Sequence, residues 1–216
     1  MENSLQKTIL EQLQWRYATK KFDAHKKISE ANWHVLEESL HLCPSSYGLQ
    51  PWKFLVVESV ELRKKLTPAS WNQTQVEDCS HFVVLTALTS LTKEYVENYI
   101  KRISNVRGTE KEKLQAYQTR IENSLINASH HEAIREWASR QTYIAMGFFL
   151  NTAALLNIDT CPMEGIIQEQ YDEILNLKNS GYSSVAAIAA GYRDESDALQ
   201  HAKKVRFEKD DIMVKV

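Results

Sequence analysis

The spacing of apolar residues predicts several amphipathic helices. Residues 4–15 place a leucine or isoleucine at every fourth position, which is typical of one apolar stripe on a helix. Ser29 is a predicted N-cap, and Ile28 and Trp33 occupy the two positions of a hydrophobic staple, so a second helix is predicted to end near residue 41. Further helices are predicted over residues 58–66, 91–136, 137–157 and 167–177, with Thr109 and Glu112 as a capping box.

Short apolar runs between these helices predict strands. The strands are expected over residues 53–59, 81–88 and 184–192, and the alternation in residues 212–216 predicts a short terminal strand. Residues 160–165 are interpreted as a turn. Because helices and strands mix without regular βαβ alternation, the chain is assigned to the α+β class with a layered sheet.

The most apolar stretch, residues 144–158, is only fifteen residues long and contains Asn151, Thr152 and Asn157. A helix that crosses a membrane needs about twenty apolar residues. We therefore expect a buried core helix and no membrane partner. The last residues, 193–216, are too polar to build a core of their own, so they predict either an arm docked on another surface or a frayed terminus.

Composition and charge narrow the possible partners. The chain has 216 residues, which fit a single domain over residues 1–216, and its formal charge of −2 gives no general attraction to nucleic acid. The N-terminus lacks the pattern of a signal peptide, and the cysteines (Cys43, Cys79 and Cys161) are odd in number, so we expect reduced thiols in a cytoplasmic protein. No metal site is expected, because adjacent His130 and His131 would project about 100° apart on a helix.

Motifs for phosphate loops, dinucleotide folds, serine nucleophiles and zinc proteases are all absent, so no catalytic residue is assigned and any reactive group is expected to be a cofactor. Residues 16–20 and 203–206 carry clustered cations. Residues 44–52 form a loop of small and hydroxyl residues, and residues 162–165 form a Pro-Met-Glu-Gly segment. Taken singly, each segment also fits a plain structural interpretation as solvated charge, helix terminator or cap.

Together, these segments resemble the nitroreductase family. The resemblance lies in the order Arg-x-x-Thr-Lys-x-Phe-Asp, Pro-Ser-Ser-x-x-x-Gln-Pro-Trp-x-Phe, Asn72 ahead of Asp78-x-Ser80-His81, Pro-x-Glu-Gly, and Lys204-x-Arg206. It is closest to the oxygen-insensitive NAD(P)H nitroreductase and dihydropteridine reductase branch. The resemblance implies a central, mostly antiparallel sheet flanked by helices, a homodimer that exchanges C-terminal arms (residues 193–216), and FMN at the subunit interface.

The resemblance also implies roles for single residues toward FMN. The phosphate would be held by Arg16, Lys204 and Arg206, which suits a dianion, and the neighbouring Tyr17 and Ala18 would line the same site. The polar pyrimidine edge of the ring would face Lys20, Asn72 and Gln75. In the segment formed by Pro162, Met163, Glu164 and Gly165, the backbone amides of Glu164 and Gly165 would approach O4 and N5 of the ring. Pro44, Ser45 and Ser46 would reach FMN from the other subunit.

Two positions depart from the family pattern. Ala18 stands where relatives often have serine, and Gln75 stands where relatives in this branch often have a second lysine. The loss of a cation near the pyrimidine edge predicts a lower reduction potential for the bound flavin than in lysine-bearing relatives.

The implied activity is a ping-pong transfer of hydride from NADH or NADPH through flavin N5 to nitroaromatics, quinones, pteridines or flavins. Residues 91–136 would border the substrate channel. Alternatives within the same fold are a dehalogenase, an enal reductase or a flavin-binding regulator without turnover, and a cofactor-free helical scaffold is the remaining possibility.

Overall fold

The computed structural model describes residues 4–127 and 133–216. Four strands form one antiparallel sheet in the order β1-β2-β4-β3. The strands are β1 (Trp52–Val56), β2 (His81–Leu88), β3 (Asp159–Met163) and β4 (Tyr182–Gly191). The central strands β2 and β4 are almost wholly buried, as their continuous apolar sequences predict.

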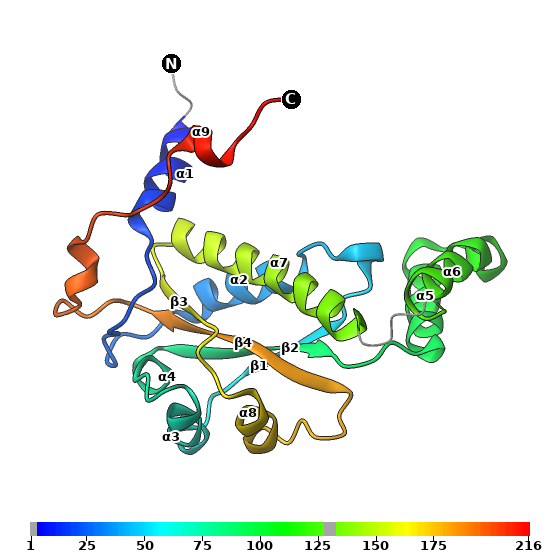
Figure 1. Cartoon of the computed structure of the whole chain (residues 1–216), viewed down its shortest axis with the longest axis horizontal. Coiled ribbons are helices and arrows are strands. Elements are labelled where there is room, and N and C mark those ends of the chain that lie inside the picture. Colours follow the sequence, from blue (N-terminus) through cyan, green and yellow to red (C-terminus); the bar gives the residue numbers. More distant parts are fainter. Residues whose placement is uncertain (1–3, 128–132) are drawn as a thin grey trace.

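Helices cover both faces of this sheet (Figure 1). On one face α2 (Glu30–His41) packs beside α7 (Ala133–Leu155), and their apolar side chains form a core with the sheet around Leu36, Phe149 and Ile188. On the other face lie α3 (Val60–Ala69), α4 (Gln75–Asp78) and α8 (Gln168–Ile174), which enclose a second core. The expected α+β fold with an antiparallel sheet between helices is therefore confirmed.

The remaining elements extend from these layers. Helix α1 (Ser4–Trp15) and the short α9 (Lys209–Ile212) lie together at one end of the molecule in Figure 1. Helices α5 (Lys93–Arg107) and α6 (Lys111–Leu125) form a separate pair at the other end, beside the short 3-10 helix η1 (Ser46–Gly48). A second 3-10 helix, η2 (Ala198–His201), lies in the C-terminal segment.

The predicted cap of α2 is confirmed, because Ser29 Oγ accepts a hydrogen bond from the backbone N–H of Asn32 at 3.3 Å. The predicted capping box of α6 is wrong. Gly108 ends α5 in a left-handed conformation (φ 64°), and α6 then begins after Glu110, which makes no side-chain cap bond.

The turn predicted over residues 160–165 is also wrong, because most of it is strand β3. Pro162 suggested a turn, but a proline is tolerated in a strand at the edge of a sheet, where its missing N–H breaks no internal ladder. The order of strands places β3 at that edge.

Two more predictions need correction, one about the burial of a helix and one about a terminal strand. Helix α7 is not buried on all sides, since Ile144, Phe148 and Leu155 are 41%, 45% and 38% exposed. The terminal strand predicted over residues 212–216 is absent: Val214 is 78% exposed and lies beside no other strand. A strand requires a hydrogen-bonded neighbour, and Figure 1 shows this tail projecting away from the sheet.

None of the described helices is long and apolar enough to cross a membrane. Residues 4–127 and 133–216 contain no cluster of histidine, cysteine and carboxylate side chains suited to a metal ion. His130 and His131 lie outside the described residues.

Candidate cofactor site

The segment that follows α1 is laid along the open edge of β3. Ala18 bridges Thr160 in parallel, and the backbone N–H of Thr19 donates to the Thr160 carbonyl at 3.2 Å. The side chain of Asp197 then ties this segment to the C-terminal part of the chain. One of its oxygens accepts hydrogen bonds from the Lys20 N–H at 2.8 Å and the Tyr17 hydroxyl at 3.0 Å. Residues nearly 180 positions apart are thereby brought to one place.

A pocket of about 600 Å³ opens at this junction. All the residues predicted for the phosphate site contribute to its wall, and no aspartate or glutamate lines it within the described part of the chain. Its predicted residues are Arg16, Tyr17, Ala18, Lys20, Pro162, Lys204 and Arg206. A pocket lined by cations without acids favours an anionic ligand.

Arg16 is the least satisfied cation in this pocket. Its Nε atom is buried and has no hydrogen-bond partner, and none of the described carboxylates forms an ion pair with it. Burial lowers the pKa of Arg16, and the nearby Arg206 guanidinium lowers it further. Lys204 approaches from the C-terminal segment and donates to the carbonyl oxygens of Arg16 at 2.5 Å and Leu13 at 2.7 Å. The three residues predicted to bind the phosphate therefore line one pocket.

Arg193 lines the same pocket but, unlike Arg16, forms an ion pair within the chain. Its guanidinium donates to Asp159 Oδ1 at 2.8 Å through Nε and at 2.5 Å through Nη2. It also lies 4.3 Å from the ring centroid of Trp15 and 4.6 Å from that of Tyr17. Because Asp159 neutralises it, Arg193 supports the wall, while the positive charge of Arg16 stays available. The sequence analysis missed Arg193, and no motif marks it.

A polar strip continues from this pocket along β3. Lys20 Nζ lies 3.7 Å from Cys161 Sγ, and Gln75 Nε2 lies 3.9 Å from the same sulfur. Gln75 is 4% exposed, and its amide also meets the side-chain oxygen of Gln73 at 3.5 Å. Burial raises the pKa of the Cys161 thiol, while the Lys20 ammonium partly offsets that effect. The strip thus presents hydrogen-bond donors and one cation from residues predicted to face the pyrimidine edge.

The polar strip ends at Gly165, which belongs to the Glu-Gly segment predicted to approach the ring. A Cβ on Gly165 would lie 2.8 Å from the Trp71 ring and 3.0 Å from Gln73 Nε2, so the close approach depends on glycine. Trp71 and Asn72 both adopt left-handed backbone conformations, with φ of 56° and 58°, and Trp71 is 68% exposed. The sequence analysis missed Trp71, although it directly precedes Asn72.

Glu164 is held by a residue that the sequence analysis did not select. The Tyr143 hydroxyl on α7 donates a very short hydrogen bond to its carboxylate. Burial and this carboxylate raise the pKa of Tyr143 to about 12, so the hydroxyl remains protonated at neutral pH. The side chain of the neighbouring Met163 is only 2% exposed and belongs to the second core, so it does not line the cationic pocket.

The Pro44-Ser45-Ser46 segment is not brought to this site within one chain. The Ser46 N–H donates to Gln141 Oε1 on α7 at 2.8 Å. Gln141 and Tyr143 are two residues apart, so they project about 200° apart around the helix axis. Helix α7 therefore stands between the Ser46 segment and Glu164 in the same chain.

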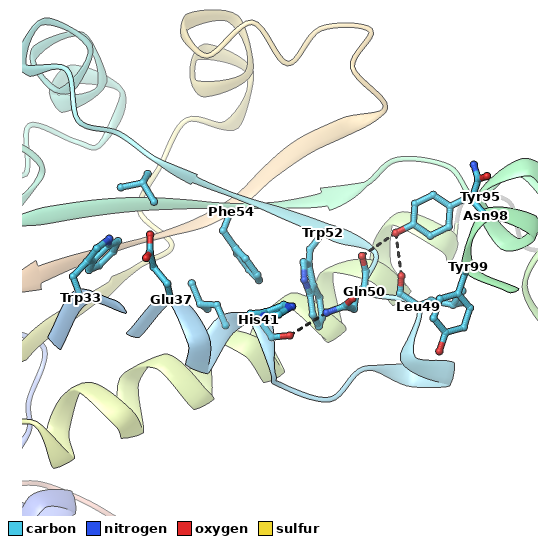
Figure 2. Close-up of a pocket in the computed structure, with 12 residues that line it drawn as sticks. Trp33, Glu37, His41, Leu49, Gln50, Trp52, Phe54, Tyr95, Asn98 and Tyr99 are labelled. Atoms are coloured by element: carbon cyan, nitrogen blue, oxygen red, sulfur yellow. Dashed lines mark hydrogen bonds between the residues drawn. The ribbon is translucent and has the colours of Figure 1, made fainter. Parts of the chain in front are cut away.

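A second pocket, of about 590 Å³, lies between α2, β1 and α5 (Figure 2). Aromatic side chains dominate its wall: Trp33, Trp52, Phe54, Tyr95 and Tyr99. The sequence analysis did not find this pocket, because its residues come from elements whose contact no local pattern indicates.

Comparison with known proteins identifies the family of this chain. The sequence profile of the Nitroreductase family matches residues 13–192. The chain belongs to the nitroreductase family. A relative in Staphylococcus saprophyticus, named "Putative NAD(P)H nitroreductase SSP0379", is 38% identical over 221 aligned residues that cover 97% of each protein. "Putative NAD(P)H nitroreductase YfkO" of Bacillus subtilis is 36% identical over 88% of this chain and 90% of its own.

Solved nitroreductase-family structures share the fold. The nitroreductase-like protein YdfN of Bacillus subtilis superposes with a TM-score of 0.86 at 18% identity, and covers 98% of this chain and 100% of its own. A protein of Exiguobacterium sibiricum, described as a "putative nitroreductase in complex with FMN", gives a TM-score of 0.82 at 22% identity, with 96% of this chain and 97% of its own covered. The family resemblance inferred from the motifs is confirmed.

Proposed function

We propose that this chain is an FMN-dependent oxidoreductase that uses NADH or NADPH to reduce electron-poor acceptors. The observation that carries the proposal is the acid-free pocket in which the Arg16 guanidinium has a buried, unpartnered Nε beside Lys204 and Arg206. Such a donor set suits a phosphate dianion, because forked guanidinium groups and a second cation form charge-assisted hydrogen bonds with it. The names of the relatives support NADH or NADPH as the electron donor, and the FMN complex of the Exiguobacterium protein supports FMN as the cofactor.

The residues along β3 would complete the FMN site. Arg16, Lys204 and Arg206 would bind the phosphate, with Tyr17 and Ala18 lining the same cavity. Lys20, Asn72 and Gln75 would face the pyrimidine edge, where Lys20 supplies the positive charge. In the segment Pro162-Met163-Glu164-Gly165, the backbone N–H groups of Glu164 and Gly165 would face the ring, with Glu164 held in place by Tyr143.

The chemistry that bound FMN supplies is acceptance of a hydride at N5 and its transfer to a second substrate in a ping-pong cycle. The acceptor classes we propose are nitroaromatics, quinones, pteridines and flavins. The protein's part is to bind FMN and to orient the substrates against it, and protons come from solvent. Residues 91–136 would border the substrate channel of a single domain that spans residues 1–216.

We further propose a cytoplasmic homodimer. Ile144, Phe148 and Leu155 lie on one stripe of α7 and leave apolar surface exposed on the central helix. The arm over residues 193–216 adds Phe207 and Val214, which are 82% and 78% exposed. A second copy that covers the stripe and exchanges the arm would bury both, and would bring Pro44, Ser45 and Ser46 of one subunit to the FMN of the other. The thiols Cys43, Cys79 and Cys161 are all unpaired and buried, which is consistent with a reducing compartment.

The dimer is tested by size-exclusion chromatography with light scattering. Phe148→Glu should give monomers that lose FMN, because it places a charge in the proposed interface. Val106→Glu is the matched control, since Val106 is 64% exposed on the distant helix α5. A Phe148→Glu protein that remains dimeric would refute this interface.

The activity is tested by the visible spectrum of the purified chain before and after anaerobic NADH or NADPH. A flavin spectrum that bleaches within seconds is the expected result. A chain that holds FMN but is reduced slowly by both nucleotides would instead be a flavin-binding regulator. A colourless chain that does not bind added FMN would refute the proposal. If bleaching is fast, an activity panel with nitroaromatic, quinone, enal and halogenated substrates distinguishes the reductase from an enal reductase or a dehalogenase.

A further inference from the structure

The segment between α2 and β1 has an unusual backbone. Tyr47, Gly48 and Gln50 all adopt left-handed conformations, with φ of 57°, 72° and 48°. Residues other than glycine rarely adopt this backbone conformation unless surrounding contacts hold it. The same segment carries Ser45 and Ser46, and Ser45 Oγ accepts the Gln50 N–H at 3.0 Å, so the position of Ser45 depends on the fold of the whole segment.

Three tyrosine hydroxyls from α5 and α6 hold this backbone. Tyr99 Oη and Tyr117 Oη both donate to the Tyr47 carbonyl, at 2.8 Å and 2.9 Å. Tyr95 Oη donates to the carbonyl oxygens of Leu49 at 3.0 Å and Gln50 at 2.9 Å, as the dashed lines in Figure 2 show. Burial raises the pKa of Tyr95 to about 12, so this donor keeps its proton at neutral pH.

The helix pair and the segment also share one apolar cluster. Leu49 is 2% exposed and packs in the same core as Ile100 and Ile121, with Tyr47 at its margin. A Cβ on Gly48 would overlap the Tyr99 hydroxyl, so the segment and α5 fit together closely at that point. The segment is thus fixed chiefly by α5 and α6, the part of the fold proposed to border the substrate channel.

We infer that Tyr95, Tyr99 and Tyr117 are positioning residues for cofactor binding: they hold the segment from residue 44 to residue 50 so that Ser45 and Ser46 meet the FMN of the other subunit. The inference rests on the proposed function, since it assumes that these serines contact FMN. Its consequence is that the α5–α6 pair influences how tightly the cofactor is retained, although none of these tyrosines lines the cationic pocket.

The test measures the dissociation constant of FMN for the intact chain by quenching of flavin fluorescence, well below the unfolding temperature. Because Tyr99 and Tyr117 share one acceptor, either hydroxyl alone should hold it. Tyr99→Phe and Tyr117→Phe should each raise the dissociation constant by less than about threefold, and the double variant by about tenfold or more. Tyr182→Phe is the control, because Tyr182 packs at the same cluster and its hydroxyl bonds to no described residue of the segment. Phenylalanine keeps the rings in place, so the variants should fold.

A second arm separates positioning from general stabilisation. Ser45→Ala should weaken FMN binding in the wild-type background, and should weaken it much less in the Tyr99→Phe/Tyr117→Phe background, because the serine is already misplaced there. Equal losses in both backgrounds, a double variant within twofold of wild type, or the same loss in Tyr182→Phe would overturn the inference. A lack of effect from Ser45→Ala in the wild-type background would also overturn it. Failure of the wild-type chain to bind FMN would instead overturn the proposed function.

Discussion

The sharpest prediction concerns Arg16. Replacing it with glutamine removes the guanidinium while keeping a shorter, uncharged polar side chain, and leaves Lys204 and Arg206 in the pocket. We assign two charge-assisted hydrogen bonds to the lost guanidinium, each contributing about 1.5 kcal/mol because the pocket is open to solvent. The sum of about 3 kcal/mol corresponds to a loss of about 100-fold in FMN affinity.

The assay compares FMN with riboflavin, which lacks the phosphate. Arg16→Gln should weaken FMN binding strongly and riboflavin binding hardly at all. The cofactor-free protein should be no less stable than wild type, because Arg16 is a partly buried cation that Arg206 repels and no described carboxylate neutralises. Lys21→Gln, an exposed lysine outside the pocket, is the control.

Two outcomes would refute the reasoning about Arg16. If FMN and riboflavin lose affinity equally, Arg16 does not recognise the phosphate. If the cofactor-free variant unfolds at a clearly lower temperature, the guanidinium supports the fold and the loss of binding is indirect.

Three further predictions concern the potential, the pH dependence and the core. Gln75→Lys should raise the midpoint potential of the bound flavin, because a second cation beside Lys20 favours the negatively charged reduced form, and an unchanged midpoint in a potentiometric titration would contradict this. The free energy of unfolding should fall as the pH drops from 6.5 to about 4: burial lowers the pKa of His81 to about 4 in the folded chain, so only the unfolded chain binds the proton in that range. Urea unfolding at several pH values should show this slope, and His81→Gln should flatten it. Phe149→Ala should cost about 3–5 kcal/mol because Phe149 is fully buried, whereas Val106→Ala should change stability by less than about 0.5 kcal/mol, as measured by urea unfolding.

Most of the helices and strands could be predicted from the sequence alone, and the residues of the proposed cofactor site were selected from it. Local periodicity predicts a helix such as α2, because one face of it, with Leu36 and Leu40, packs on the core whatever lies opposite. The same reasoning predicts helix α1, although none of its residues is buried within one chain. Motif order was equally informative, since the spacing of Arg16, Glu164 and Lys204 could be compared with the family without knowledge of the fold.

Which of these residues lie together, and which charges remain without a partner, depends on contacts that appear only in the folded chain. Strand β3 was misjudged because the tolerance for Pro162 depends on its place at the sheet edge, a property of strand order and not of local sequence. Arg193 and Arg16 look alike in the sequence, yet Asp159 neutralises the first and leaves the second available. Such differences arise from contacts between distant segments, whose energies depend on geometry that no local pattern contains.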